Sequence, residues 1–349
     1  MIGVNTKYLN YLKLCGKQRQ LKWRPPMPAF FDTLVGNLMV PTILFFVLGL
    51  IAAFVRSDLS IPEGAAKFMS LYLLLAIGFK GGNSLAQHGL QGDLALTILA
   101  GLLLSFLIPF LAFALLRILT RLDPVNAAAV AGHYGSISIV TFVAASSLLE
   151  LSGITFDGYM VAVAASMEVP AILSALWIAH RYSGSQDTGR VPMRELFANG
   201  SVLLLTGAFV IGALTQDKGM QMIAPFVVTP FTGILCLFLL DMGLNAGRSI
   251  LNNRHMLTPG LFCFGLLMPM IGASLGWAAG AMIGLQTGSV FLLMVLSASA
   301  SYIAVPAAMR IALPKAESGI YLTLSLGVTF PFNITLGLPL YLWLAGLGS

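Results

Sequence analysis

Ten long apolar runs, separated by short polar stretches, constrain this chain more than any other feature. An α-helix needs about 20 apolar residues to cross the hydrocarbon core of a bilayer, and the runs are close to that length. A β-barrel is excluded because its strands would show alternating rather than continuous hydrophobicity. The sequence therefore predicts an all-α polytopic membrane protein with about ten transmembrane helices. The predicted runs are Thr33–Val55, Lys67–Gly82, Leu94–Leu119, Pro124–Leu149, Gly158–His180, Gly200–Thr215, Thr229–Gly247, Thr258–Leu285, Ser289–Leu313 and Ser318–Leu344.

The composition excludes a soluble fold. Apolar residues make up 58% of the 349 residues and charged residues only 9%, whereas a soluble domain carries about a quarter of its residues as charges. The formal net charge of +6 comes from cations spread among the loops, which suits lipid headgroups rather than a nucleic acid. The three cysteines, Cys15, Cys236 and Cys263, lack metal-ligand spacing. We therefore expect the lipid bilayer as a partner, no nucleic acid, and no metal beyond Na⁺.

The two halves of the chain resemble each other when the sequence is shifted by about 162 residues. Segments 79–82, 135–138 and 157–170 then align in order with segments of the second half. Each half holds five runs, so the second half must enter the membrane from the opposite side. We expect a 5+5 inverted repeat, which is characteristic of secondary transporters. The expected parts are a basic N-terminal extension (1–29), a first five-helix repeat (30–182), a cytoplasmic linker (183–195) and a second five-helix repeat (196–349).

Lysine and arginine gather in the loops on one side of the predicted bundle. Cytoplasmic loops carry an excess of these cations, so both termini are expected on the outer side of the plasma membrane, a bacterial inner membrane. The basic segment ahead of the first run does not fit this rule, and no apolar core of a signal peptide follows it. Either Met27 is the true start, with residues 1–26 upstream, or the segment forms a short interfacial helix. The cations of the positive side are Arg56, Lys67, Arg117, Arg121, Arg181, Arg190, Arg194, Arg248, Arg254, Arg310 and Lys315.

Two runs contain stretches that weaken a helix near the midplane of the membrane. The stretches are 132–138 in the fourth run and 297–302 in the ninth, where glycine, serine and a following proline disfavour regular helix. Each break would present a half-helix N-terminus to an anion, and carbonyls and hydroxyls to Na⁺. The alternative is that these small residues only permit close helix packing. The candidate substrate-binding residues are Gly135, Ser136, Ser138, Ser299, Ser301 and Tyr302.

Charged residues inside the apolar runs are a second clue, because each costs a few kcal/mol unless it is paired or hydrated. Glu168 lies midway along the fifth run and can bind a coupling Na⁺ or carry a proton. Thr329 is its counterpart in the second half, and Asn333 adds an amide oxygen. The candidate sodium-binding residues are Thr141, Glu168, Thr329 and Asn333.

Lys80 and Asp241 lie at equivalent places near the ends of the second and seventh runs. They are candidates for a charge pair or gate across the pseudo-symmetry axis, and Lys80 could also attract an anion at a vestibule. The alternative is that both side chains snorkel to the headgroup level. His133 lies within the first break, and we expect it to be packed or hydrogen-bonded rather than a metal ligand.

The signatures of common enzymes are absent from the sequence. There is no His-Glu-x-x-His, no Gly-x-Ser-x-Gly and no phosphate-binding loop. We therefore expect no enzyme and no cofactor, and a transport step driven by an ion gradient.

At these residues the sequence resembles the sodium-dependent bicarbonate transporter family of SbtA-like permeases, from about Phe31 to Leu347. The resemblance implies a core and a gate domain, a homotrimer, Na⁺-coupled import of bicarbonate by an elevator-like motion, and regulation by a PII-like partner. The central loop near residues 181–195 is short for such regulation. The motifs that carry the resemblance are segments 77–82, 132–138 with Thr141, 167–171, 242–244, and 297–306 leading into 310–314.

Three functional hypotheses follow. The first is a Na⁺-coupled symporter for a small anion, with bicarbonate as the first candidate. The second is a proton-coupled carrier of another small organic anion or metabolite, in which Glu168 titrates. The third is a membrane sensor or scaffold that binds a soluble partner without transport.

Overall fold

A computed structural model describes residues 39–88, 93–183, 200–302, 305–306, 308–309 and 313–347, which form helices and connections without a β-strand. The basic extension with Met27 and nearly all of the linker 183–195 lie outside these residues. The first half contains α3 (Pro41–Phe54), α4 (Glu63–His88), α5 (Asp93–Leu119), α6 (Pro124–Gly135), α7 (Ile139–Leu151), α8 (Met160–Ser166) and α9 (Glu168–Ser183). The second contains α11 (Gly200–Val227), α12 (Phe231–Asn253), η1 (Arg254–Met256), α13 (Pro259–Ile283), α14 (Thr287–Ala298), α16 (Ser318–Leu322), η2 (Thr323–Thr329), α17 (Phe330–Phe332), η3 (Asn333–Gly337) and α18 (Leu338–Leu347).

The all-helical prediction is confirmed, and each predicted apolar run falls on one or more of these helices. Within the described residues, six helical stretches are long and apolar enough to cross a membrane, and α3 and α14 are shorter apolar helices. Helix α11 kinks at Gln216, whose φ is 52°, directly after the predicted end of its run at Thr215. The protein is therefore a multi-pass membrane protein. The six stretches are Asp93–Leu119, Pro124–Leu151, Met160–Tyr182, Phe231–Met256, Pro259–Ile283 and Ser318–Leu347.

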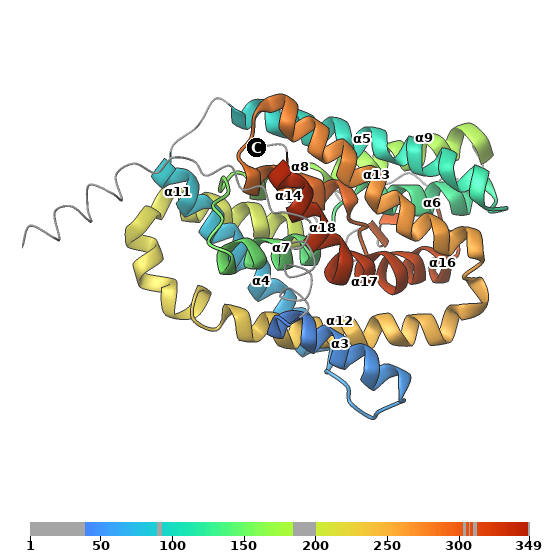
Figure 1. Cartoon of the computed structure of the whole chain (residues 1–349), viewed down its shortest axis with the longest axis horizontal. Coiled ribbons are helices and arrows are strands. Elements are labelled where there is room, and N and C mark those ends of the chain that lie inside the picture. Colours follow the sequence, from blue (N-terminus) through green and yellow to red (C-terminus); the bar gives the residue numbers. More distant parts are fainter. Residues whose placement is uncertain are drawn as a thin grey trace, which may run out of the picture.

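Two helices of the first half pack against helices of the second half: α3 packs against α12, and α4 packs against α11 (Figure 1). At each crossing a glycine of one helix lies against the backbone of the other. A Cβ on Gly49 would meet the α12 backbone around Gly243, and one on Gly243 would meet the α3 backbone around Gly49. Gly82 and Gly212 have the same reciprocal relation on α4 and α11. Small residues allow backbones to approach closely, which stabilises helix pairs in lipid by van der Waals contact.

The loops gather at two opposite ends of the molecule, as helices that cross it in alternating directions require. At one end lie the loops after α3 and α12 and those before α6 and α16. At the other end lie the last residues of α4, the loop after α7, the α11 kink and the loop before α14. Hydrogen bonds link segments at each end. At the first end, Arg248 Nη2 donates to the Leu59 carbonyl (2.7 Å) and the Glu317 N–H donates to Asn126 Oδ1 (2.7 Å). At the second end, Gln87 Nε2 donates to Asp217 Oδ1 (2.5 Å) and Thr155 Oγ1 donates to Gln286 Oε1 (3.3 Å).

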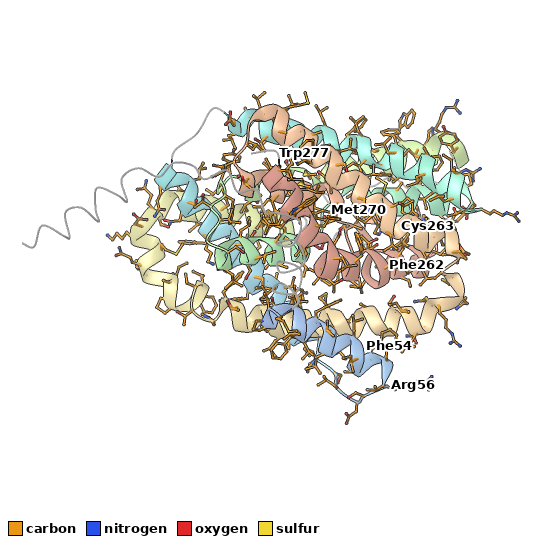
Figure 2. All side chains as sticks on the ribbon, in the orientation of Figure 1. Phe54, Arg56, Phe262, Cys263, Met270 and Trp277 are labelled. Carbon is orange, nitrogen blue, oxygen red and sulfur yellow. The ribbon has the colours of Figure 1, made fainter. Side chains whose placement is uncertain are left out.

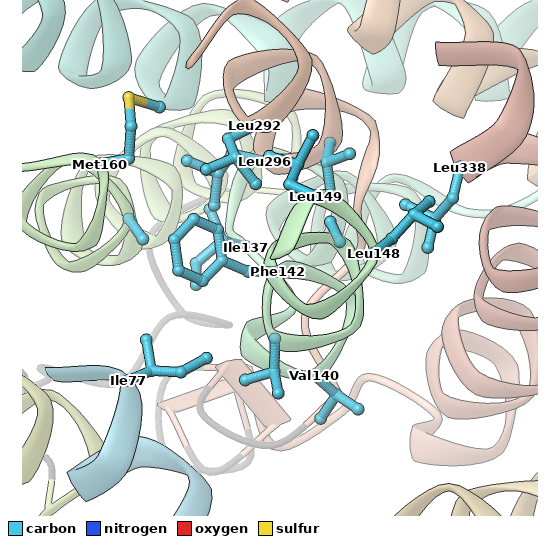
Figure 3. Packing of buried hydrophobic residues seen from close by; sticks show 14 of the residues in the cluster. Ile77, Ile137, Val140, Phe142, Leu148, Leu149, Met160, Leu292, Leu296 and Leu338 are labelled. Carbon is cyan, nitrogen blue, oxygen red and sulfur yellow. The ribbon is translucent and has the colours of Figure 1, made fainter. Parts of the chain in front are cut away.

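The larger apolar core joins helices of both halves. Figure 3 shows Ile137 and Phe142, from the first break and α7, in one packed group with Leu292 and Leu296 of α14. All four side chains are buried. A second core holds α6, α9 and the ends of α5 and α13 that meet them. The two predicted breaks therefore lie inside packed protein, where irregular backbone is tolerated at membrane depth.

Candidate functional site

The fourth predicted run is broken where its glycine and serine residues predicted a break. Helix α6 ends at Gly135, and the chain runs extended through Ser136, with φ −87° and ψ 172°. Helix α7 begins after Ser138, whose Oγ caps it by accepting a hydrogen bond from the Thr141 N–H at 3.2 Å. A new helix N-terminus is thus formed inside the protein, and an anion is stabilised at such a terminus.

The ninth predicted run breaks in the same way. Helix α14 ends at Ala298, and Ser299 is extended, with φ −87° and ψ 163°. Ser299 Oγ donates to the Leu296 carbonyl at 2.9 Å. Ser301 Oγ accepts from the Val305 N–H at 3.4 Å, where helical structure resumes. The second break therefore also exposes backbone groups that a continuous helix would pair.

The two breaks cross and hydrogen-bond to each other. The Ser138 N–H donates to Ser299 Oγ at 2.8 Å, between residues 161 apart in the chain. The Ser301 N–H donates to the His133 carbonyl at 2.8 Å. Buried backbone donors need partners, and each break supplies one for the other. The structure thus brings the predicted substrate residues of both halves to one place.

Three hydroxyls in and beside the crossing have no hydrogen-bond partner among the described residues. They are Ser136 Oγ, Ser297 Oγ and the Tyr302 hydroxyl, all buried. Tyr302 lies near Ser138 and packs edge-on against Phe330, with ring centroids 5.4 Å apart. An unsatisfied buried hydroxyl costs about 1–3 kcal/mol, so these groups on the two broken runs point to a polar ligand.

Two predicted sodium residues carry hydroxyls bonded to the broken helices. Thr141 Oγ1 donates to Ser138 Oγ at 2.9 Å. Thr329 Oγ1 donates to the Gly265 carbonyl at 2.8 Å and shares a short hydrogen bond with the Tyr134 hydroxyl of α6. Both side chains are buried. The hydroxyl oxygens of Thr141 and Thr329 are therefore held on either side of the first break.

Asn333 reaches the second break. Its Nδ2 donates to the Ala298 carbonyl at 2.9 Å, and its Oδ1 accepts from the Tyr341 hydroxyl at 2.9 Å. Thr329 ends the π-helical segment η2 and Asn333 begins the π-helical segment η3. Wide turns of this kind occur frequently at functional sites. The sequence analysis did not predict these wide turns. Pro331, which lies between the two segments, is a local signal for a departure from regular α-helix.

Glu168 begins α9 and is 8% exposed. Its carboxyl group has no hydrogen bond or ion pair within the part of the chain that the structure describes. The preceding residue, Met167, accepts a hydrogen bond from the Ser105 hydroxyl of α5. Gly135 at the first break packs closely on Pro109 and the Ser105 carbonyl of the same helix. Helix α5 thus links the Glu168 region to the first break, although no bond joins Glu168 to Thr329 or Asn333.

Comparison with known protein families assigns the chain to one superfamily. The profile of the Na⁺-dependent bicarbonate transporter superfamily matches residues 41–346. The chain belongs to this superfamily. Comparison with curated proteins gives no match. Membership agrees with the resemblance seen in the sequence, and it places the chain with Na⁺-dependent transporters rather than with enzymes.

Lys80 and Asp241, the candidates for a charge pair or gate, do not form an ion pair with each other in the structure. Lys80 Nζ instead contacts Glu150 Oε1 at 3.1 Å and lies 4.5 Å from the centre of the Phe231 ring. Buried Asp241 accepts a hydrogen bond from Asn245 Nδ2 at 3.0 Å, one helical turn away on α12. The pairing failed because Glu150 ends α7 at the same end of the molecule as Lys80, a proximity that sequence spacing does not reveal.

Lys80 and Glu150 line a pocket of about 560 Å³ between α4, α7 and the start of α8. The pocket lies at the end of the molecule that holds the Thr155–Gln286 bond. The lining also contains the acidic residues Glu150 and Asp157, and the attraction of an anion by Lys80 at a vestibule, the second role that the sequence suggested for it, stays a prediction. The remaining lining residues are Ile77, Gly81, Ser84, Leu85, Ser146, Gly153, Ile154, Thr155, Phe156, Asp157, Gly158, Tyr159, Val161 and Gln286.

His133 is packed and hydrogen-bonded, as predicted. Its Nδ1 lies 2.7 Å from the Ala129 carbonyl, and its ring stacks on Tyr321 at 4.3 Å between centroids. Tyr134 and Tyr341, which hold Thr329 and Asn333, were missed by sequence reasoning. Tyrosines in apolar helices carry no signal of such partners, because the contacts join segments distant in the chain.

Proposed function

We propose that the protein is a secondary active symporter that couples the entry of Na⁺ to the uptake of a small anion, with bicarbonate as the first candidate. The observation that carries the proposal is the crossing of the two breaks, with unsatisfied buried hydroxyls at Ser136, Ser297 and Tyr302. The name of the superfamily supports both the ion and the anion.

The anion site is the first break together with the facing serines of the second. The N-terminus of α7 carries partial positive charge and suits a single negative charge. Bicarbonate needs both donors and acceptors around it, and a serine hydroxyl can serve as either. Gly135, Ser136, Ser138, Ser299, Ser301 and Tyr302 form this site.

The sodium site uses oxygen ligands beside the anion. Thr141 and Thr329 hold their hydroxyl oxygens beside the first break, and the side-chain amide of Asn333 lies at the second, with its oxygen bonded to Tyr341. Hard cations prefer oxygen ligands. Glu168 adds a carboxylate that balances the cation charge. This role explains why an ionisable group without a partner stands inside an apolar run.

The 5+5 inverted repeat is part of the proposal, with repeats at 30–182 and 196–349 joined by the linker 183–195. The reciprocal glycine pairs support it, because Gly49 corresponds to Gly212 and Gly82 to Gly243 at a shift of about 162 residues. The repeat also makes Ser136 equivalent to Ser299, and both are the extended residues that follow the broken helices α6 and α14. Transport would proceed by an elevator-like exchange of access between the two sides of the membrane.

The orientation and the assembly follow from charge and resemblance. The end of the molecule with Arg56, Arg248 and Arg254 is the cytoplasmic side, which puts both termini on the outer side of a bacterial inner membrane. A homotrimer and a PII-like regulator are the assembly that the resemblance implies.

Uptake of labelled bicarbonate into proteoliposomes tests the proposal. We expect uptake with an inward Na⁺ gradient to exceed uptake without it. Equal uptake in both conditions would contradict the proposed coupling of anion uptake to Na⁺ entry.

A second candidate is a proton-coupled carrier of another small organic anion, favoured by the buried carboxyl of Glu168 without a bonded partner. It predicts uptake that follows an imposed pH gradient and survives the removal of Na⁺. The third hypothesis, a sensor or scaffold, predicts that Ser138→Leu combined with Ser301→Leu leaves function intact.

A further inference from the structure

A cavity of about 390 Å³ lies where the ends of α3 and α12 meet, away from the crossing of the breaks. The described residues that form its walls include three arginines, Arg56, Arg248 and Arg254, and no acidic residue. The other lining residues are Ala53, Ser57, Leu251 and Asn252.

Among the described residues none of the three arginines forms an ion pair with a carboxylate, although Arg248 interacts electrostatically with Asp241, two turns away on α12. Among the described residues the ion pair found is Lys80–Glu150, at the other end of the molecule. Arg248 donates to the Leu59 carbonyl at 2.7 Å, a single neutral acceptor. Like charges in one cavity repel, and a bound anion removes that repulsion. Guanidinium groups offer paired donors that match the oxygens of a phosphate.

The backbone at Arg56 is held in an unusual conformation that turns the chain at the cavity. Its φ is 56°, one of two positive values among the described non-glycine residues. Hydrogen bonds from the N–H of Arg56 to the Ala53 carbonyl (3.0 Å) and of Ser57 to the Ala52 carbonyl (2.9 Å) hold the turn. These two bonds form a Schellman motif, a common way for a helix to end, and they set Arg56 at the end of α3 beside the cavity.

The outer side of α3 next to the cavity is apolar and exposed. Phe54 is 50% and Val55 69% exposed, and Ile51 and Leu59 are exposed as well. Figure 2 shows Phe54 and Arg56 projecting at the same end of α3. A molecule with a phosphate in the cavity could therefore lay a hydrocarbon chain along this helix face.

We propose that this cavity binds the phosphate of an anionic phospholipid headgroup, with its acyl chains along the outer face of α3. Basic pockets between transmembrane helices on the cytoplasmic side are suited to such headgroups. The bound lipid would join α3 to α12, because Arg56 follows α3 while Arg248 and Arg254 lie at the end of α12. This site is independent of the proposed transport function.

Lipid retention by the purified full chain tests the proposal. The protein is exchanged into detergent with equal phosphatidylglycerol and phosphatidylcholine, and the retained lipid is measured by native mass spectrometry. We expect a preference of at least about tenfold for phosphatidylglycerol. The variant Arg56→Gln/Arg248→Gln/Arg254→Gln should lose it. The matched control is Arg117→Gln/Arg121→Gln/Arg181→Gln, which removes the same charge at the same end and includes Arg117, likewise bonded to a backbone carbonyl.

Three outcomes would overturn the assignment. Equal retention of both lipids by the wild type would contradict the site. So would a control variant that loses the preference for phosphatidylglycerol as fully as the cavity variant does. Displacement of phosphatidylglycerol by inorganic phosphate at millimolar concentration shows a soluble phosphate as the ligand. If the triple variant aggregates, the melting temperature of the wild type with each added lipid tests the proposal. We expect phosphatidylglycerol to raise this temperature and phosphatidylcholine to leave it unchanged, and an equal effect of both lipids would contradict the site.

Discussion

Equivalent regions of the two halves, around Glu168 and around Thr329, are built differently. The junction of α8 and α9 in the first half holds a buried carboxyl group without a bonded partner. In the second half, Thr329 and Asn333 lie in wide π-helical turns with their polar atoms bonded to α6, α13 and α14. The glycine contacts between the two halves are reciprocal, whereas the polar groups of these two regions differ. We expect this difference to give Glu168 a larger share of Na⁺ binding than Thr329, whose hydroxyl is already bonded.

Replacing Glu168 should have the largest effect on transport. Glu168→Gln keeps the shape of the side chain but removes the charge that balances Na⁺, so we expect Na⁺-driven uptake to fall to background. The protein should remain folded, because the carboxyl group has no bonded partner to lose. Uptake in proteoliposomes and size-exclusion chromatography measure the two effects. Undiminished Na⁺-driven uptake by the Glu168→Gln variant would show that Glu168 is not part of the Na⁺ site.

The glycine pairs test the symmetric frame. Gly243→Ala and Gly82→Ala should each lower the free energy of unfolding by about 1–3 kcal/mol, because the new Cβ meets backbone of the partner helix. Gly233→Ala is the matched control, since nothing lies within 4 Å of its Cβ. Thermal unfolding in detergent compares them. A large loss at one glycine and none at the other would break the equivalence of the two crossings.

Thr329→Val should reduce stability more than Na⁺ affinity. The change removes the partner of the Tyr134 hydroxyl and of the Gly265 carbonyl, which costs about 1–3 kcal/mol. The melting temperature should fall, while the Na⁺ concentration for half-maximal uptake changes less than in a Glu168 variant. A normal melting temperature with lost Na⁺ dependence would show that Thr329 acts mainly as a Na⁺ ligand and contributes little to stability.

The Lys80–Glu150 pair should show the smallest effect. The two side chains are 21% and 46% exposed, and a partly exposed pair contributes about 0.2–1 kcal/mol. A double-mutant cycle of Lys80→Gln and Glu150→Gln on unfolding should give a coupling in this range. The Lys80→Gln variant should also raise the KM for the anion and leave kcat unchanged. An unchanged KM would remove the vestibule role of Lys80.

The sequence predicts the helices and both breaks because their causes are local. Continuous apolar runs require helices in a bilayer, and Gly132 to Ser138 weakens a helix by its own chemistry. The partner of Lys80 was not predictable, because Glu150 approaches it only after two runs have crossed the molecule. The wide turns around Pro331 depend on contacts with α13 and α14, and local spacing does not encode these contacts. Charges and tyrosines at span ends thus need the fold before their partners are known.

The most direct test of the crossing as the binding site uses its unsatisfied hydroxyls. Ser136→Ala combined with Ser297→Ala removes two buried groups without partners, so the stability should stay equal or rise. Ser274→Ala on α13 is the control, because Ser274 is exposed and bonds only to its own helix. The measurement is Na⁺-driven uptake of labelled bicarbonate by these variants. We expect the double variant to fold normally and lose uptake while the control keeps it, and wild-type uptake by a folded double variant would contradict the account.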